Sequence, residues 1–251
     1  ETALDGPSRS LPPVSNVGGM KKPIEDHAER FSAAAASYDD DQDSTAYLAC
    51  ADLVVDHAAP DADDVVLDLG TGTGAIALAL APSAGRVVGR DISAGMLDEA
   101  RSKAAEAGLD NVTFGEGRFR DPNHDAAADT ESPETPHADA HDARVDVVVS
   151  NFAMHHLADE EKREAIRAIA GLNPRRFVLG DVMLFGEPDP DEPFYDPDVD
   201  DPATVGILAD ALTDEGFGLV AVDRVHDQVG VLVAERFGNR SERVSVGGGD
   251  E

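Results

Sequence analysis

The chain has 251 residues with 51 acidic against 20 basic side chains, a net charge of −31, and its length permits one or two domains. This charge excludes a basic patch of the kind that binds nucleic acid or an anionic membrane, because no cluster of cations is present to displace counterions. A single cysteine, no apolar run long enough to span a bilayer and no signal-peptide core predict a soluble, cytoplasmic protein.

Residues 1–23 are rich in Pro, Ser and Gly, and we expect a disordered N-terminal tail there. Order is expected from residue 24, where Phe31 and Tyr38 belong to a series of apolar side chains at helical spacing. A second helix should begin after Ser44, whose hydroxyl is suited to an N-cap, and Pro60 closes it. The segment 24–60 is therefore predicted to be helical.

A short apolar strand at 65–69 runs directly into a turn with glycine at positions 70, 72 and 74. The alanine-rich helix 75–81 follows, so the turn brings bare backbone and the amides of a helix start close to a ligand. Asp68 at the tip of the strand would repel a pyrophosphate and attract a cationic group such as an amine. The turn therefore predicts a binding site for a ligand that carries a positive charge.

The stretch from Asp68 to Gly74 resembles the first motif of class I S-adenosylmethionine-dependent methyltransferases. In that family the acidic residue lies near the amino end of the cofactor's methionine and the glycines pack against the cofactor. The resemblance implies S-adenosyl-L-methionine as the cofactor, with contacts from the turn. The residues implied there are Asp68, Gly70, Thr71, Gly72 and Gly74.

The stretch from Phe31 to Asp39 resembles the segment that precedes the core in many small-molecule methyltransferases, where it forms part of a lid. The resemblance implies a helical lid over residues 24–60 and a cofactor contact from Tyr38. The same aromatic side chain could instead pack a helix onto the core, and the sequence leaves both interpretations open.

A second strand, 86–91, ends in Asp91, about 20 residues beyond the glycine turn, where an acidic side chain can accept both hydroxyls of a ribose. A carboxylate at the start of the next helix, which Ser93 caps, is the alternative. The resemblance implies the ribose role for Asp91 and places Ile92 and Met96 beside the adenine.

The third strand, 111–115, is followed by Glu116-Gly117-Arg118. The family usually has an Asp after this strand that reaches the adenine amino group, and that Asp is missing here. Glu116 or the backbone near Gly117 and Arg118 is expected to replace it.

Residues 122–143 form an acidic stretch without periodicity and are predicted to be an exposed insertion. Its three histidines, His124, His137 and His141, match the spacing of no tight metal site, and we expect no metal. The β-branched run 145–150 then predicts a central strand.

A polar break, Asn151 to Leu157, follows this strand at the edge of the sheet where ligands of open α/β folds bind. It resembles the fourth methyltransferase motif in the form common among enzymes that methylate small molecules, and it implies that Asn151 contacts the cofactor. The form typical of amino-group methylation in nucleic acids is absent. His155 or His156 could deprotonate or orient an acceptor hydroxyl, and we favour His155. Capping a helix or packing under the cofactor is the alternative for either histidine.

The remaining pattern predicts a helix from Asp159, a strand at 176–181, a helix at 202–215 and two strands at 219–225 and 229–237. A loop between them, 185–197, carries the aromatics Phe185, Phe194 and Tyr195, which could line an acceptor pocket or plug the core beneath the loop. Residues 238–251 are expected to form a flexible tail.

We therefore predict one domain, residues 24–237, with the three-layer, Rossmann-like α/β methyltransferase fold: a seven-stranded, mostly parallel sheet with one antiparallel strand. The function implied is methyl transfer from S-adenosylmethionine to a small-molecule acceptor, with no nucleic acid or membrane partner. A non-catalytic sensor or scaffold that binds the same cofactor is the alternative. A nicotinamide-dependent oxidoreductase is a weaker one, because its glycines are spaced Gly-x-Gly-x-x-Gly. The acidic composition resembles that of halophilic archaeal proteins and predicts a fold that requires salt.

Overall fold

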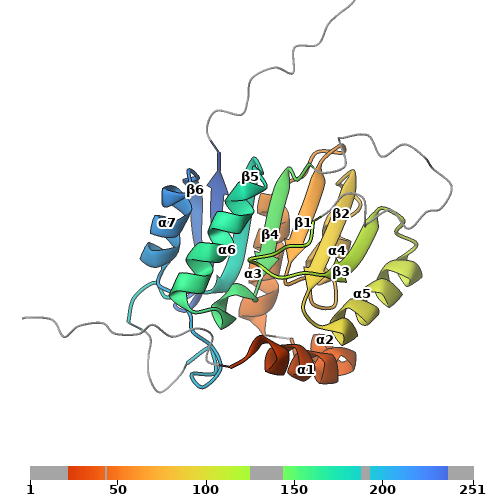
Figure 1. Ribbon diagram of the computed structural model, residues 1–251, viewed down its shortest axis with the longest axis horizontal. Coiled ribbons are helices and arrows are strands. Elements are labelled where there is room, and N and C mark those ends of the chain that lie inside the picture. Colours follow the sequence, from red (N-terminus) through yellow and green to blue (C-terminus); the bar gives the residue numbers. More distant parts are fainter. Residues whose placement is uncertain (1–21, 43, 125–143, 188–192, 237–251) are drawn as a thin grey trace, which may run out of the picture.

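The computed structural model of the chain describes residues 22–42, 44–124, 144–187 and 193–236 (Figure 1). The predicted tails, apart from residues 22–23, and most of the predicted insertion at 122–143 lie outside these ranges. Within them no helix is long and apolar enough to cross a membrane.

One seven-stranded sheet forms the centre of the fold, with the strand order β3-β2-β1-β4-β5-β7-β6. All neighbouring strands are parallel except β7, which is antiparallel to both β5 and β6. The predicted fold class is confirmed, including the single antiparallel strand. The strands are β1 Val65–Leu69, β2 Arg86–Asp91, β3 Val112–Glu116, β4 Val147–Asn151, β5 Arg176–Val182, β6 Gly218–His226 and β7 Val229–Glu235.

Helices cover both faces of this sheet (Figure 1). The longer ones are α1 Ile24–Ala34, α3 Thr45–Ala58, α5 Ala94–Ala107, α6 Asp159–Gly171 and α7 Val205–Asp214; the shorter ones are η1 Ala35–Ser37, α2 Tyr38–Asp41, α4 Ala75–Leu80 and η2 Met154–His156. Side chains alternate between the faces of each strand. Val66 packs into the cluster formed with α3 and α4, whereas Leu67 packs into the cluster formed with α6 and α7.

Helix starts follow the predicted capping chemistry. The hydroxyls of Ser44 and Ser93 accept the amides of Tyr47 and Met96 at 3.1 and 3.2 Å. Thr204 does the same for Ile207 at 3.2 Å, which sets the start of α7 three residues later than predicted. Satisfying these free amides fixes where each helix begins.

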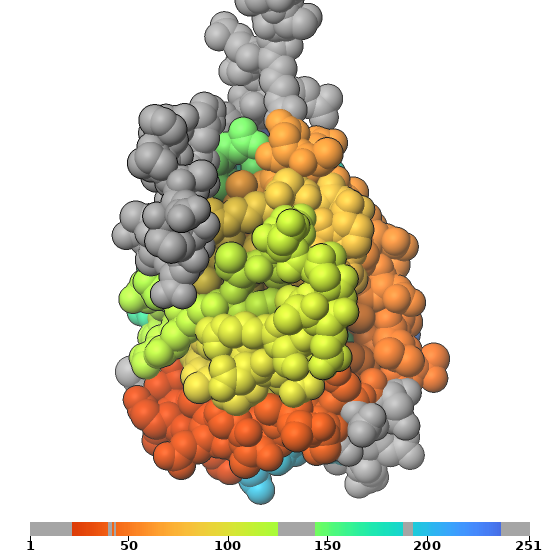
Figure 2. Space-filling view, turned by 90° about the vertical axis from the view of Figure 1, so that its right-hand side faces the viewer, coloured from red at the N-terminus to blue at the C-terminus, as the bar shows by residue number. Residues whose placement is uncertain are grey.

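The chain leaves β1 toward β2 and β3 on one side, and β4 and β5 continue on the other side. The carboxyl ends of β1 and β4 therefore lie at the point where the winding direction reverses, which is where open α/β sheets bind ligands. Helices α1 and α2 lie at this edge (Figure 1), and α1 contacts α5. Figure 2 shows the α1–α2 segment, in red, directly beneath the yellow-green α5. The segment predicted to form a lid therefore lies at the edge of the sheet where the ligand site is predicted.

Candidate functional site

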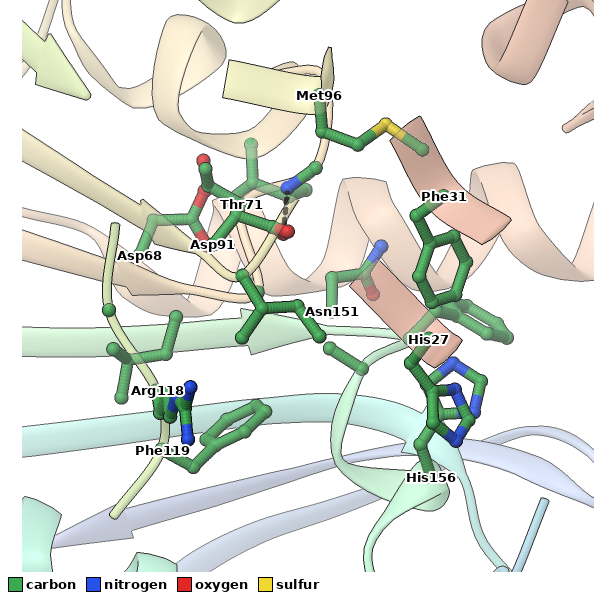
Figure 3. Close-up of a pocket in the computed structure, with 18 of the residues that line it drawn as sticks. His27, Phe31, Asp68, Thr71, Asp91, Met96, Arg118, Phe119, Asn151 and His156 are labelled. Carbon is green, nitrogen blue, oxygen red and sulfur yellow. Dashed lines mark hydrogen bonds between the residues drawn. The ribbon is translucent and has the colours of Figure 1, made fainter. Parts of the chain in front are cut away.

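A cavity of about 1130 Å³, including its open mouth, lies at the carboxyl edge between β1 and β4 (Figure 3). Of the predicted site residues, those that line it are Tyr38, Asp68, Gly70, Thr71, Gly72, Asp91, Ile92, Met96, Gly117, Arg118 and Asn151. The structure thus gathers them into one space; Gly74 and His155 are outside the lining.

The glycine turn forms one wall of the cavity. Gly70 has φ +72°, and a Cβ built on it would lie 2.3 Å from the Cβ of Ala153. Its amide and that of Thr71 both donate to the carbonyl of Arg90, at 2.8 and 3.0 Å, which ties the turn to β2. Only glycine permits this close approach of the β1 and β4 connections.

Gly74 serves packing and not the cavity. It caps α4 in the left-handed conformation, with φ +87°, and a Cβ there would lie 3.1 Å from Ala100 of α5. The third glycine of the motif therefore allows close packing between neighbouring elements.

Asp68 lies at the tip of β1 and is fully buried. Its carboxylate accepts a hydrogen bond from the hydroxyl of Thr71 at 2.7 Å. Within the described ranges no lysine or arginine pairs with this carboxylate. Burial, with a smaller contribution from nearby Asp91, raises the pKa of Asp68 to about 7 against the opposing effect of the Thr71 hydrogen bond. A buried carboxyl without a cation is poised to accept one, because a positive ligand would offset its desolvation.

Asp91 lies at the end of β2 and fulfils a structural role as well as facing the cavity. One carboxylate oxygen accepts the amide of Gly72 at 2.9 Å (dashed in Figure 3), and the other accepts the amide of Ser93 at 2.9 Å. Burial raises its pKa, and these backbone hydrogen bonds oppose the rise. Each carboxylate oxygen has a second lone pair, so both can still accept a ligand hydroxyl.

The wall beside Asp91 contains Ile92, Met96 and the segment Gly117 to Arg120. Glu116, the predicted substitute for the missing Asp, is exposed at the end of β3 and does not line the cavity. Of the two predicted alternatives, only the backbone near Gly117 and Arg118 is placed to contact a ligand here.

The lid segment is fixed to the core by polar contacts. The hydroxyl of Ser32 lies 2.8 Å from that of Ser93, and Asp39 accepts Thr73 at 2.6 Å and pairs with Lys103. Tyr38 lines the cavity and also meets Phe31 edge-on, with ring centroids 6.3 Å apart. Both interpretations of Tyr38 therefore fit its position.

The two histidines after β4 lie side by side, with ring centroids 4.1 Å apart, but only one of them reaches the cavity. His155, the favoured catalytic residue, is buried outside the lining, with Nδ1 2.5 Å from the Asp181 carboxylate. His156 lines the cavity, and its Nδ1 lies 2.7 Å from Asp200. Burial and the neighbouring His155 lower the pKa of His156 to about 4, against the opposing effect of Asp200. His156 is therefore neutral at pH 7, and the ring nitrogen that carries no proton can accept a hydrogen bond.

The predicted aromatic loop does not reach the cavity: Phe185, Phe194 and Tyr195 are all outside its lining. Phe194 instead packs against Phe152, with centroids 6.3 Å apart. The aromatic side chains near the His156 end come from elsewhere. They are His27 and Phe31 of α1, Tyr47 of α3 and Phe152 after β4.

Comparisons with known proteins agree with this architecture. Residues 66–173 match the family described as "Methyltransferase domain". A relative from Bacillus subtilis (strain 168), described as an uncharacterized methyltransferase, YcgJ, is 32% identical over 142 residues, covering 56% of this chain and 49% of its own length. The chain spans about half to two thirds of the curated relatives it matches.

Solved structures with the same fold include DhpI in complex with SAH, at 22% identity and TM-score 0.59, covering 85% of this chain and 96% of the other. Magnesium protoporphyrin IX methyltransferase (ChlM) from Synechocystis PCC 6803 with bound SAM is 23% identical with TM-score 0.51, covering 76% and 78%.

Proposed function

We propose that the chain carries a class I S-adenosylmethionine-dependent methyltransferase domain and transfers the methyl group of that cofactor to a small-molecule acceptor; the match of residues 66–173 to the methyltransferase family supports this. In this proposal Asp68 binds the amino end of the cofactor's methionine and Asp91 accepts the ribose hydroxyls. Ile92 and Met96 pack on one side of the adenine, and the backbone at Gly117 and Arg118 contacts its edge.

The observation that carries the proposal is the placement of two carboxylates on one cavity: Asp68, buried at the tip of β1, and Asp91, partly buried at the tip of β2. Asp68 has no cation beside it among the described residues, and Asp91, which lines the same cavity, has acceptor capacity left beyond the two backbone amides that it binds. An amine and a ribose within one ligand satisfy both groups.

When bound, the cofactor would supply a methyl group on a positively charged sulfur: an in-line nucleophile forms a bond to the methyl carbon while the carbon–sulfur bond breaks and a neutral thioether leaves. The protein must therefore align the acceptor and exclude water, and it needs no strong acid. The side chains of Phe31, Tyr38 and Phe152 enclose the cavity near His156 and are suited to both tasks. His156, neutral at pH 7, can accept a hydrogen bond from an acceptor hydroxyl.

A small acceptor fits this end of the cavity better than a macromolecule. Helix α1 closes over it, and the net charge of −31 opposes an approach by nucleic acid. The residues after β4, Asn151 to Ala153, are not the form typical of nucleic-acid amino methylation.

Calorimetric titration of S-adenosylmethionine into the full chain at molar salt tests the proposal, with NAD as the comparison ligand. We expect saturable binding of the first and none of the second. Absence of heat and of thermal stabilisation with S-adenosylmethionine would overturn it. Binding without turnover across a broad panel of hydroxyl, amine and thiol acceptors would instead favour a sensor or scaffold.

A further inference from the structure

A cluster of buried imidazoles and carboxylates lies behind the His156 end of the cavity. His155, His156 and Asp200 each offer a ligand atom, and these atoms lie within 4.8 Å of one another. The residues come from separate parts of the chain: η2 after β4, and the loop that precedes α7. They are distinct from the histidines of the predicted insertion.

Asp181 fixes how His155 faces this cluster. Its carboxylate lies 2.5 Å from Nδ1 of His155 and also accepts the His155 amide at 3.0 Å. An Nδ1 proton donated to Asp181 leaves Nε2 with a lone pair, and Nε2 lies 3.9 Å from an oxygen of Asp200. A carboxylate that holds the far nitrogen of an imidazole is the arrangement that orients histidine ligands toward a metal.

The distances suit an ion between the two groups better than a hydrogen bond. At 3.9 Å the gap is too long for a hydrogen bond. Two ligand atoms on a tetrahedral zinc lie roughly 3.4 Å apart, given metal–ligand distances of about 2.0–2.2 Å. Nδ1 of His156 lies 2.7 Å from an Asp200 oxygen, so this separation would have to increase by about 0.7 Å for both atoms to bind one zinc ion. The proton between them would then move to Nε2 of His156.

His27 adds an independent observation. Its side chain is 2% exposed, and neither ring nitrogen has a hydrogen-bond partner within the described residues. Its ring centroid lies 5.1 Å from that of His156, and Figure 3 shows the two rings side by side at the end of the cavity away from Asp68. A buried imidazole without a partner is costly, and a metal ion would satisfy it.

We propose that His155, His156 and Asp200 bind one divalent transition-metal ion, Zn²⁺ by preference. The ring of His27 lies outside this cluster of ligand atoms and would have to turn toward the ion to become the fourth ligand. Imidazole nitrogens with one carboxylate oxygen match the ligands that Zn²⁺ takes in tetrahedral sites. The charges also balance, because the two positive charges of the ion meet the carboxylates of Asp200 and Asp181. The proposal stands on this cluster and does not depend on the proposed methyl transfer.

The ion would lie beside His156, which lines the cavity. If the chain transfers methyl groups as proposed, the ion would be placed to orient an oxygen of the acceptor. If it does not, the ion would serve to join α1 to the core. Either way the site is detectable by metal binding alone.

The test uses the full chain at molar salt, stripped of metal with EDTA and titrated with Co²⁺, whose visible absorption reports the ligand set. We expect saturation at one Co²⁺ per chain, displacement by Zn²⁺, and no displacement by excess Mg²⁺. Asp200→Asn and His156→Gln should bind Co²⁺ at least about 100-fold more weakly, and Asp181→Asn about 10–100-fold more weakly. His57→Gln, a histidine paired with Asp223 elsewhere in the fold, should bind as the wild type does.

Misfolding of a variant is controlled by measurements on the wild type, whose melting temperature should rise with Zn²⁺ and fall with EDTA. His27→Gln provides a mild variant because its ring nitrogens make no hydrogen bond to lose. It should retain cooperative unfolding while weakening Co²⁺ binding. A wild type that shows no saturable Co²⁺ spectrum, or equal binding by the wild type and the Asp200 and His156 variants, would overturn the proposal.

Discussion

The carboxyl of Asp68 has no cationic partner among the described residues, and we therefore predict that cofactor affinity falls steeply in mild acid. Its pKa is raised to about 7 in the unliganded protein by burial, so lowering the pH protonates it before binding. An amino group beside it would hold the carboxylate ionised in the complex, and binding in acid must then expel a proton.

The magnitude follows from the fraction of Asp68 that is ionised. With a pKa of about 7, binding is weakened by a factor of about 33 at pH 5.5 and about 1.3 at pH 7.5. Partial loss of the proton from the ligand's own amino group, whose pKa is about 7.8, weakens binding about 1.5-fold at pH 7.5. The net expectation is affinity roughly 20-fold weaker at pH 5.5 than at pH 7.5.

Calorimetry with S-adenosylhomocysteine measures this, because the compound keeps the amino group and does not react. Repeating the titration at pH 5.5 in buffers of different ionisation enthalpy should reveal release of nearly one proton. Asp68→Asn should bind weakly at both pH values and lose the dependence. Equal affinity of the wild type at pH 5.5 and 7.5, with no proton released, would refute the reasoning.

The same shift has a consequence for stability. Because the folded-state pKa of Asp68 lies above its ordinary value, the unliganded fold binds a proton more tightly than the unfolded chain does. Its stability should therefore decline as the pH rises from about 4 through about 7. S-adenosylhomocysteine should offset that decline, so its thermal stabilisation should be larger at pH 7.5 than at pH 5.5.

Further changes test the remaining features of the site. Gly70→Ala should destabilise the fold by about 1–3 kcal/mol in chemical denaturation and abolish cofactor binding, because its Cβ would overlap Ala153. Gly108→Ala, at φ +66° with open space around it, should cost about 1 kcal/mol and leave binding intact; equal loss of binding in both would contradict the close-approach argument. Asp91→Asn should weaken binding about 10–100-fold in calorimetry, whereas Thr204→Ala, which removes the cap of α7 outside the cavity lining, should weaken it little. The melting temperature should rise between low and molar salt because screening relieves the repulsion among 51 acidic residues, and a flat profile would count against a salt-requiring fold.

Local patterns were sufficient to predict most elements of this fold. Continuous apolar runs located most strands, and helical spacing with serine caps located most helices, to within a few residues. The glycine turn and the acids at positions 68 and 91 could be placed at one edge because parallel strands end together there.

The direction of adjacent side chains could not be predicted in the same way. Met154–His156 forms one turn of 3₁₀-helix, in which successive side chains are rotated by about 120°. That rotation sends His155 toward Asp181 and His156 toward the cavity. Their partners, Asp181 and Asp200, are 26 and 44 residues away in the sequence, and only tertiary packing brings them together.

The aromatic loop illustrates the same limit. Composition identified Phe185, Phe194 and Tyr195 as candidates, but register and packing turn them away from the cavity. Phe152 takes that place with φ +50°, a backbone conformation that no local pattern indicated.

The polar contacts that hold the α1–α2 segment have a kinetic consequence. Its pairing of Asp39 with Lys103 is half exposed and therefore open to screening by dissolved ions. The molar salt that should stabilise this acidic protein would at the same time weaken the ion pair between Asp39 and Lys103. Ligand exchange should thus accelerate under the very conditions in which the molecule resists heat best.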